Sequence, residues 1–343
     1  MNTNKGRLSV GDWVEVRSKE EILKTLDSKG QLDGMPFMPE MFSFCGRKFQ
    51  VYKRAHKTCD TVFPPRSRRV DRAVHLETRC DGQAHGGCQA ACLIFWKEAW
   101  LKPIGGDPEM DAADCGAGTP TAGCTEPDVW NQTLIPGSND DVPKYVCQAT
   151  QVPYATTHLA WYDIRQYIED YTSGNVTLQQ ILAGAVYSAY YNLSQAGIGL
   201  GRPMRWFYGR MHWLWQGSDF PRMEGKIAEG SATPFATLNL EPGELVRVKS
   251  HEEILRTVTI KRNNRGLSWD AEMVPYCGGT YRVLRRVSKI IDEKTGKRLE
   301  MKNPCITLDT VVCQSRYSNC RMFCPRSIYP YFREIWLERV DEK

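Results

Sequence analysis

The chain has 343 residues, of which 41% are hydrophobic and 25% charged, and its formal net charge at pH 7 is +5. These fractions are those of a soluble globular protein, and the length predicts more than one packed unit. A charge this small on this length gives no reason to require a nucleic-acid partner.

The first residues of the chain and the cysteine count bear on the cellular compartment and its redox state. Residues 1–7 contain no apolar core of a signal peptide, which predicts a cytoplasmic, reducing location. In that setting the 13 cysteines are expected to be metal ligands or reactive thiols rather than disulfides. The odd count agrees with this expectation.

An internal repeat organises the chain. Residues 11–23 align without a gap to residues 243–255, and the same register places Cys45-Gly46 on Cys277-Gly278. The chain is therefore predicted to contain two copies of one unit.

The repeat also sets the predicted domain boundaries. The copies span 8–104 and 240–340, and a segment of different character, 105–239, joins them. Each copy is expected to form its own small β unit.

Each copy begins with an alternating apolar and polar run, which predicts a strand. A helix is expected next, because Ser18 with Glu21, and Ser250 with Glu253, match the capping-box pattern. Residues 292–297 have the composition of a hairpin turn. The predicted strands are 13–17, 48–52 and 74–78 in the first copy, and 280–284 and 306–308 in the second.

The short strands and the leading Gly-Asp-x-Val-x-Val pattern of the first copy resemble small SH3-like barrels. This resemblance implies a fold class that is mainly β with inserted helices (α+β). Two tandem SH3-like barrel repeats would be joined by a helical segment.

The joining segment is predicted to change character along its length. Residues 105–142 are rich in Gly, Pro, Asp and Thr and indicate a long irregular connection. Helices are expected over 159–171 and 178–191. The uncharged stretch 176–201 is long enough to span a bilayer, but its Gln, Asn and Ser residues favour a packed helix, so no membrane span is expected.

Four cysteines recur in each copy, and their clustering indicates metal ligation. Cys88 and Cys92 lie four residues apart and would share one face if a helix starts at the Gly86-Gly87 turn, and Cys320 and Cys324 have the same spacing. Four thiolates suit either tetrahedral zinc or an iron–sulfur cluster. The predicted metal ligands are Cys45, Cys80, Cys88 and Cys92 in the first copy, and Cys277, Cys313, Cys320 and Cys324 in the second.

The cysteine spacing favours an iron–sulfur cluster, with zinc as the alternative. Seven and three residues separate the last three cysteines of the first copy, whereas zinc sites favour tightly spaced pairs. Aromatic residues such as Phe95 and Trp96 follow directly and would shield a cluster. His85 is an alternative ligand, but the second copy has Tyr317 or Ser318 there, so we expect a loop histidine.

The cysteines outside the repeated sets offer an asymmetric place for chemistry. Cys59, Cys124 and Cys147 are predicted to converge on a catalytic centre, which Cys115 or solvent would complete with an open ligand position. The alternative is that they are separate buried thiols, which is the expectation for Cys305.

Several longer motifs resemble one family over the full length of the chain. The family comprises bacterial proteins of unassigned function that are associated with biosynthetic gene neighbourhoods. The resemblance implies a bacterial origin and a biosynthetic role, and it supplies no catalytic residues. The motifs that carry it are residues 37–41, 45–47, 85–90, 147–150 and 322–330.

The sequence therefore predicts a cysteine-ligated metalloprotein, iron–sulfur in type, acting as an enzyme in redox or cluster-dependent biosynthetic chemistry. Its partner would be a small-molecule substrate or a redox protein. The alternative is a zinc-stabilised tandem SH3-like module that binds a protein or a nucleic acid.

Overall fold

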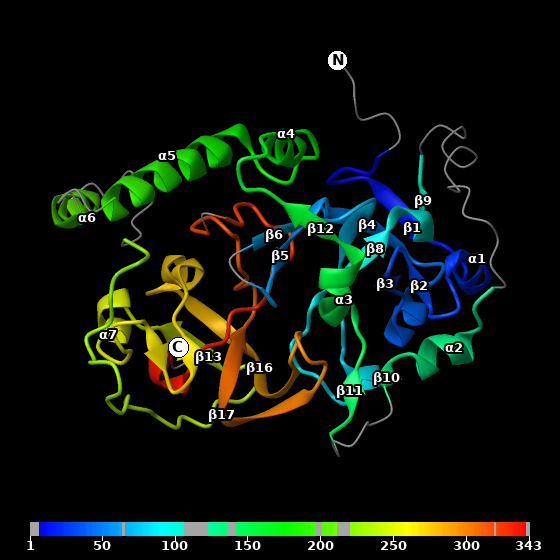
Figure 1. Cartoon of the computed structure of the whole chain (residues 1–343). Helices are drawn as coiled ribbons and strands as arrows, with labels where there is room; N and C mark the ends of the chain where they lie inside the picture. Colours follow the sequence, from blue (N-terminus) through cyan, green and yellow to red (C-terminus); the bar gives the residue numbers. More distant parts are fainter. Residues whose placement is uncertain are drawn as a thin grey trace. The chain divides into compact units, whose positions relative to one another are not determined.

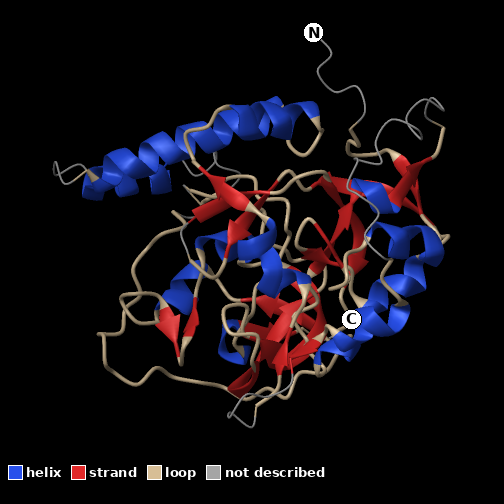
Figure 2. Cartoon of the chain, turned by 45° about the vertical axis from the view of Figure 1, so that its right-hand side comes forward, coloured by secondary structure: helices blue, strands red, loops and turns tan. Residues whose placement is uncertain are grey.

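Antiparallel strand pairs dominate the fold, and helices accompany them (Figure 2). The largest sheets among the described residues are two half-barrels, so the protein is mixed α/β with many antiparallel strands. The computed structural model describes residues 7–63, 66–105, 123–135, 142–196, 201–210, 220–318 and 320–340.

The chain divides into two units. The second repeat contributes two short segments to unit 1, one from a hairpin tip and one from a loop. Unit 1 comprises the residues up to Leu178 with Lys289–Glu300 and Phe323–Ser327, and unit 2 comprises Gln179–Ser288, Met301–Met322 and the residues from Ile328 onward.

The first repeat contributes a five-stranded sheet with the order β8-β7-β4-β1-β9. Its strands β1, β4, β8 and β9 are labelled in Figure 1. Val14 in β1 pairs with Phe49 on one side and with Pro103 on the other. The predicted alternation is confirmed, because Val14 and Val16 are buried whereas Trp13 is exposed. The elements are β1 (Trp13–Val16), α1 (Lys19–Thr25), β2 (Gln31–Leu32), β3 (Met35–Pro36), η1 (Pro39–Phe44), β4 (Lys48–Arg54), β5 (Lys57–Asp60), β6 (Arg66–Arg69), β7 (Ala73–Arg79), η2 (Gln83–His85), β8 (Leu93–Lys97), η3 (Glu98–Trp100) and β9 (Leu101–Pro103).

The second repeat has a sheet of the order β17-β16-β13-β18, which matches four of the five strands of the first. β16 and β17 form a hairpin around the turn predicted at 292–297. The elements are β13 (Leu245–Val248), α7 (His251–Leu255), β14 (Asn263–Asn264), β15 (Leu267–Ser268), η6 (Ala271–Tyr276), β16 (Thr280–Ile291), β17 (Arg298–Leu308), η7 (Glu334–Trp336) and β18 (Leu337–Arg339).

Equivalent local contacts in the two copies confirm the internal repeat. Both capping boxes form: the Glu21 and Glu253 backbone N–H groups each donate to the preceding serine hydroxyl over 3.3 Å. Each copy then turns at a cysteine-glycine pair that follows a 3-10 helix. The N–H of Gly46 donates to Val16, and that of Gly278 donates to Val248, both over 2.8 Å.

Each unit has its own aromatic core. In unit 1, Phe37 meets Trp100 edge-on with ring centroids 5.2 Å apart. In unit 2, Trp269 meets Trp336 in a similar way at 5.1 Å. The two apolar clusters contain no residue in common, and the cluster of unit 1 also includes Cys124, Val129 and Val152 from the joining segment.

The joining segment adds short strands and most of the longer helices. The predicted helix start at Leu159 is wrong, because Leu159 ends a strand that pairs with Ser67 and the helix begins at Arg165. The predicted helix over 178–191 is confirmed, and much of the predicted irregular connection lies outside the described residues. The elements are α2 (Glu126–Asn131), β10 (Leu134–Ile135), β11 (Lys144–Tyr145), α3 (Gln148–Ala155), β12 (Thr157–Leu159), α4 (Arg165–Thr172), α5 (Leu178–Gln195) and α6 (Gly201–Arg210).

Within the part of the chain that the structure describes, no helix combines the length and the apolar character needed to cross a bilayer. This includes α5, for which the sequence predicts a packed helix.

Candidate metal centre

A compact loop in unit 1 carries three of the repeated cysteines. Cys80 follows β7 and Cys92 precedes β8, and the Cys80 N–H donates to the Cys92 carbonyl over 2.9 Å, which closes the loop at its base. Inside it, the His85 N–H donates to Gly82 and the Cys88 N–H donates to His85. The loop is therefore held by its own backbone.

Two glycines of this loop adopt the same left-handed conformation but differ in their surroundings. Gly82 and Gly87 both have a φ of 74°. A Cβ atom at Gly82 would lie 1.9 Å from the Cys88 carbonyl oxygen, whereas one at Gly87 would meet nothing within 4 Å. Gly82 is thus required for both its φ and the close approach of Cys88.

Substituting these two glycines separates the two requirements. Gly87→Ala is expected to cost about 1–2 kcal/mol of unfolding free energy, because only the left-handed backbone disfavours a side chain. Gly82→Ala should cost about 1–3 kcal/mol more, because it also drives a Cβ into the backbone of Cys88. Urea unfolding of both variants measures the difference, and equal losses would contradict the close packing of the loop.

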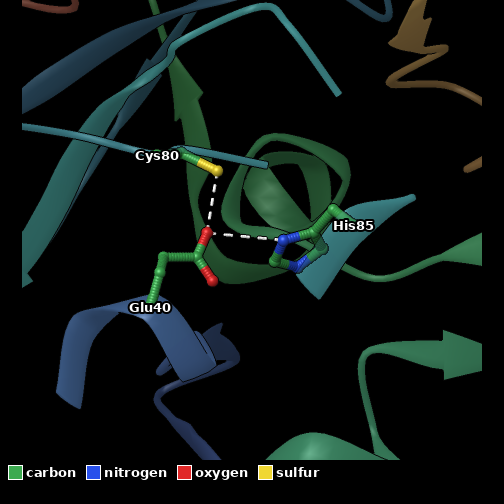
Figure 3. A group of neighbouring side chains, drawn as sticks. All are labelled: Glu40, Cys80 and His85. Atoms are coloured by element: carbon green, nitrogen blue, oxygen red, sulfur yellow. Dashed lines mark hydrogen bonds and ion pairs between the residues drawn. The ribbon is translucent and has the colours of Figure 1, made fainter. Parts of the chain in front are cut away.

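A carboxylate, a thiol and an imidazole meet beside this loop (Figure 3). The Cys80 thiol donates to Glu40 Oε1 over 2.8 Å, and His85 Nδ1 lies 3.4 Å from the same oxygen. One possible ligand atom from each of the three residues falls within 4.8 Å of the others. Among the described residues this is the one such group of three acidic, cysteine or histidine side chains.

The electrostatics of this group follow from its burial. Burial strongly raises the pKa of the Cys80 thiol, and the Glu40 carboxylate raises it further. Burial also raises the pKa of Glu40, but the contacts from His85 and Cys80 outweigh it and leave the pKa below its ordinary value. In the absence of a cation Cys80 therefore keeps its proton and Glu40 is ionised. A coordinated cation would reverse the state of the thiol, since metal-bound thiols are deprotonated.

Three further cysteines join Cys80 and His85 around one cavity of about 40 Å³ in unit 1. They are Cys88 and Cys92 from the loop, and Cys147, which caps the N-terminus of α3. Burial raises the pKa of Cys92 to about 11 and that of Cys147 to about 12. The cavity is therefore lined by four cysteines, and burial keeps the thiols of Cys80, Cys92 and Cys147 protonated at neutral pH.

A buried glutamine brings Cys147 to the loop. The Gln148 amide N–H₂ donates to the carbonyls of Phe95 and Pro36 over 2.8 and 3.1 Å, and its oxygen accepts from the Phe95 N–H over 2.8 Å. Gln148 thus occupies the hydrogen-bonding edge of β8 as a neighbouring strand would. This fixes the first turn of α3 against the strand that follows Cys92.

The second repeat supplies a cation and an anion to the same cavity of unit 1. Arg326 and Glu293 both line it, and the guanidinium donates from Nη2 to Glu293 Oε1 over 2.7 Å. Its Nη1 lies 3.3 Å from the Thr61 hydroxyl oxygen. Arg326 is 1% exposed, and its positive charge lies near enough to Cys92 to oppose the rise in that thiol's pKa caused by burial.

Cys45, predicted as the fourth ligand of the first copy, lies elsewhere in unit 1. It ends η1 and is partly buried, and burial raises its pKa while the nearby Lys19 opposes the rise. It is not among the residues that line the cavity. Glu40, in the same short helix, approaches Cys80 instead.

The predicted catalytic cysteines have different neighbours. Cys147 lines the cavity, whereas the buried Cys124 lies near Asp128 and donates to the Thr125 carbonyl. The Cys59 N–H donates to the Cys324 sulfur over 3.1 Å. No described group of three ligand atoms within 4.8 Å contains Cys59, Cys124 or Cys147. Cys115 lies outside the described residues.

The predicted ligands of the second copy are divided between the units. Cys324 belongs to unit 1, while Cys277, Cys313 and Cys320 belong to unit 2. The Cys313 sulfur lies 3.5 Å from the Ser315 hydroxyl oxygen. Cys305, expected to be a buried thiol, is 1% exposed.

Sequence reasoning missed Glu40, Glu293 and Arg326. Glu40 had a signal in the repeat, because the alignment places it on Glu272 of the second copy. There the carboxylate accepts the N–H groups of Arg316 and Tyr317 over 2.9 and 2.6 Å. A repeated acidic residue beside a cysteine loop therefore marked a contact with that loop in both copies.

Comparison with models of known protein families finds none that matches this chain, and comparison with curated proteins finds no match either.

Proposed function

We propose that the cavity of unit 1 holds an iron–sulfur cluster through Cys80, Cys88, Cys92 and Cys147, and that the protein acts in redox or cluster-dependent biosynthetic chemistry. The observation that carries the proposal is the gathering of four thiols from the loop and from α3 around one cavity. Four thiolates are the usual ligand set of such clusters. The resemblance noted in the sequence is the basis for a biosynthetic role.

The spacing of the sulfurs supports a cluster over a single zinc ion. Sulfurs bound to one tetrahedral zinc lie about 3.8 Å apart, because each Zn–S bond is about 2.3 Å long. The one described group of three ligand atoms within 4.8 Å contains a single sulfur, that of Cys80. A cluster carries its own irons and sulfides between the cysteines and suits thiols that line a wider space.

The composition of the cavity wall agrees with this proposal. Ala90, Leu93 and Phe95 supply apolar surface, and Arg326 supplies a positive charge. An anionic cluster is stabilised by a buried cation and tuned by the dielectric around it. Cys45, although repeated as Cys277, is not required as a ligand in this arrangement.

A second candidate is zinc bound by Glu40, Cys80 and His85. It is favoured by the closeness of their ligand atoms, and three protein ligands of these types leave one position open on zinc. In this case the protein would be a zinc-stabilised tandem binding module for a protein or nucleic-acid partner. The matching strand orders of the two half-barrel sheets support the finer assignment of SH3-like repeats.

Metal analysis after anaerobic purification tests the proposal. The wild-type protein is expected to be brown, with iron and acid-labile sulfide in similar amounts. Cys92→Ser and Cys147→Ser should lose most of the visible absorbance, because each removes a thiolate ligand. Cys45→Ser is the matched control and should retain the absorbance, since Cys45 lies outside the cavity.

The outcomes separate the two candidates. A colourless protein that holds one zinc, and loses it in His85→Ala or Glu40→Gln, would support the zinc site and contradict the cluster. Unchanged metal content in both Cys92→Ser and Cys147→Ser would contradict metal binding by the cavity thiols.

A further inference from the structure

The cavity of unit 1 is lined by a buried arginine with an unsatisfied nitrogen. Arg326 Nε lacks a hydrogen-bond partner, and Arg326 is 1% exposed and lines the cavity. Glu40, which contacts the lining residues Cys80 and His85 through Oε1, has a buried Oε2 without a hydrogen-bond partner. Buried polar groups are nearly always satisfied, so this grouping indicates a polar occupant.

The guanidinium of Arg326 is held in a fixed orientation. Glu293 accepts from Nη2 over 2.7 Å, and the Thr61 hydroxyl oxygen lies 3.3 Å from Nη1. Thr61 also donates to Glu293, which fixes the carboxylate that holds the arginine. Nε is the one guanidinium nitrogen without a hydrogen-bond partner. A carboxylate is the acceptor that matches such a donor.

Charge and volume narrow the class of ligand. The carboxylate of Glu293 lines the cavity, and that of Glu40 contacts the lining Cys80, so both disfavour a second or third negative charge on a ligand. A cavity of about 40 Å³ has room for a molecule of a few non-hydrogen atoms. A monoanion therefore fits this site better than a phosphate.

We propose that this cavity binds a small monocarboxylate, whose carboxylate accepts the Arg326 Nε–H. The inference does not rest on the proposed function: the cluster and the carboxylate would fill the same cavity, so the carboxylate binds protein that holds no cluster. The contact with Arg326 itself does not require a metal and is tested separately. Arg326 comes from the second repeat, so ligand binding in unit 1 depends on both copies.

Isothermal titration of anaerobically purified protein with acetate and with glycolate at pH 7 tests the site. Arg326→Gln is expected to weaken binding about tenfold or more, because a charge-assisted hydrogen bond is lost. Glu293→Gln should strengthen binding, since it removes the carboxylate that competes for the guanidinium. Arg165→Gln, which removes an exposed arginine of α4, should leave the affinity unchanged.

Opposite shifts in the two cavity variants would distinguish ligand contact from general damage to the fold. Inorganic phosphate should bind more weakly than acetate. Absence of acetate and glycolate binding to the wild type, which would fit a buried water, overturns the proposal. Equal affinities for acetate in the wild type and Arg326→Gln overturn the proposal too. If Arg326→Gln does not fold, an unchanged acetate affinity in Glu293→Gln overturns the proposal.

Metal content measured on the same samples keeps the two proposals distinguishable. A protein without metal that still binds acetate through Arg326 contradicts the proposed function and upholds the carboxylate site. A protein that holds a cluster, and whose acetate affinity does not change in Arg326→Gln, upholds the proposed function and contradicts the carboxylate site.

Discussion

Replacing Asp170 by Asn is expected to destabilise unit 1 by about 3–5 kcal/mol, because it leaves the Lys57 ammonium group buried without a counter-charge. Lys57 Nζ lies 2.6 Å from Asp170 Oδ2, and the two side chains are 1% and 0% exposed. Burial lowers the pKa of Lys57, and the Asp170 carboxylate acts against that fall. The pair ties α4 to β5, and His56 Nε2 lies 3.2 Å from the other oxygen of the carboxylate.

Urea unfolding of Asp170→Asn and of Arg165→Gln checks this expectation. Arg165 lies on the same helix and pairs with Asp163, but its side chain is 83% exposed, so its removal should cost about 1 kcal/mol or less. The double variant Lys57→Met with Asp170→Leu should recover much of the loss, because replacing both charges by apolar groups removes the unpaired ion. A loss below about 1 kcal/mol in Asp170→Asn would show that Lys57 reaches water.

The repeated framework could be predicted because its determinants are local. The alternation around Val14 specifies a strand with one buried face, and Ser18 with Glu21 specifies a helix start within four residues. The same signals recur around Val246 and Ser250. Short-range patterns of this kind survive tertiary packing, and the structure confirms each of them.

The helix boundary near Leu159 shows where local pattern fails. The apolar residues from Leu159 onward fit a helix, but Leu159 is buried in a strand that pairs with Ser67 across a long sequence separation. The helix starts after Asp163, whose carboxylate accepts the Arg165 N–H over 3.1 Å. Pairing with a distant strand therefore determines the structure at Leu159, and the predicted helix forms only from Arg165 onward.

The composition of the candidate site could be predicted only in part. Cys80, Cys88 and Cys92 are close in sequence, and one closed loop carries all three. Cys147 lies near these three cysteines because Gln148 forms hydrogen bonds with β8, and no sequence pattern predicts those bonds. Arg326 comes from the second repeat, so its place in unit 1 depends on long-range packing.

Lowering the pH from 7 to 5 is expected to cost the wild-type protein about 2 kcal/mol of unfolding free energy through His75 alone. Burial lowers the pKa of His75 to about 3, although its hydrogen bond with the Ile94 carbonyl favours the charged form. The ring is 0% exposed, its Nδ1 lies 2.8 Å from Ile94 O, and its centroid lies 4.5 Å from that of Phe95. Between pH 6.5 and 3, the unfolded chain therefore binds a proton that the folded chain excludes.

The direction of the effect follows from that difference in bound protons. Stability contributed by the neutral ring is complete above pH 6.5 and is lost as the pH falls, by about 5 kcal/mol in total near pH 3. His75→Gln keeps a donor for Ile94 but cannot titrate, so its stability should fall less between pH 7 and 5, by about 2 kcal/mol. His158→Gln is the matched control, because this exposed histidine of β12 should leave the wild-type slope intact. Parallel curves of unfolding free energy against pH for the wild type and His75→Gln would show that the buried ring takes up a proton in the folded state.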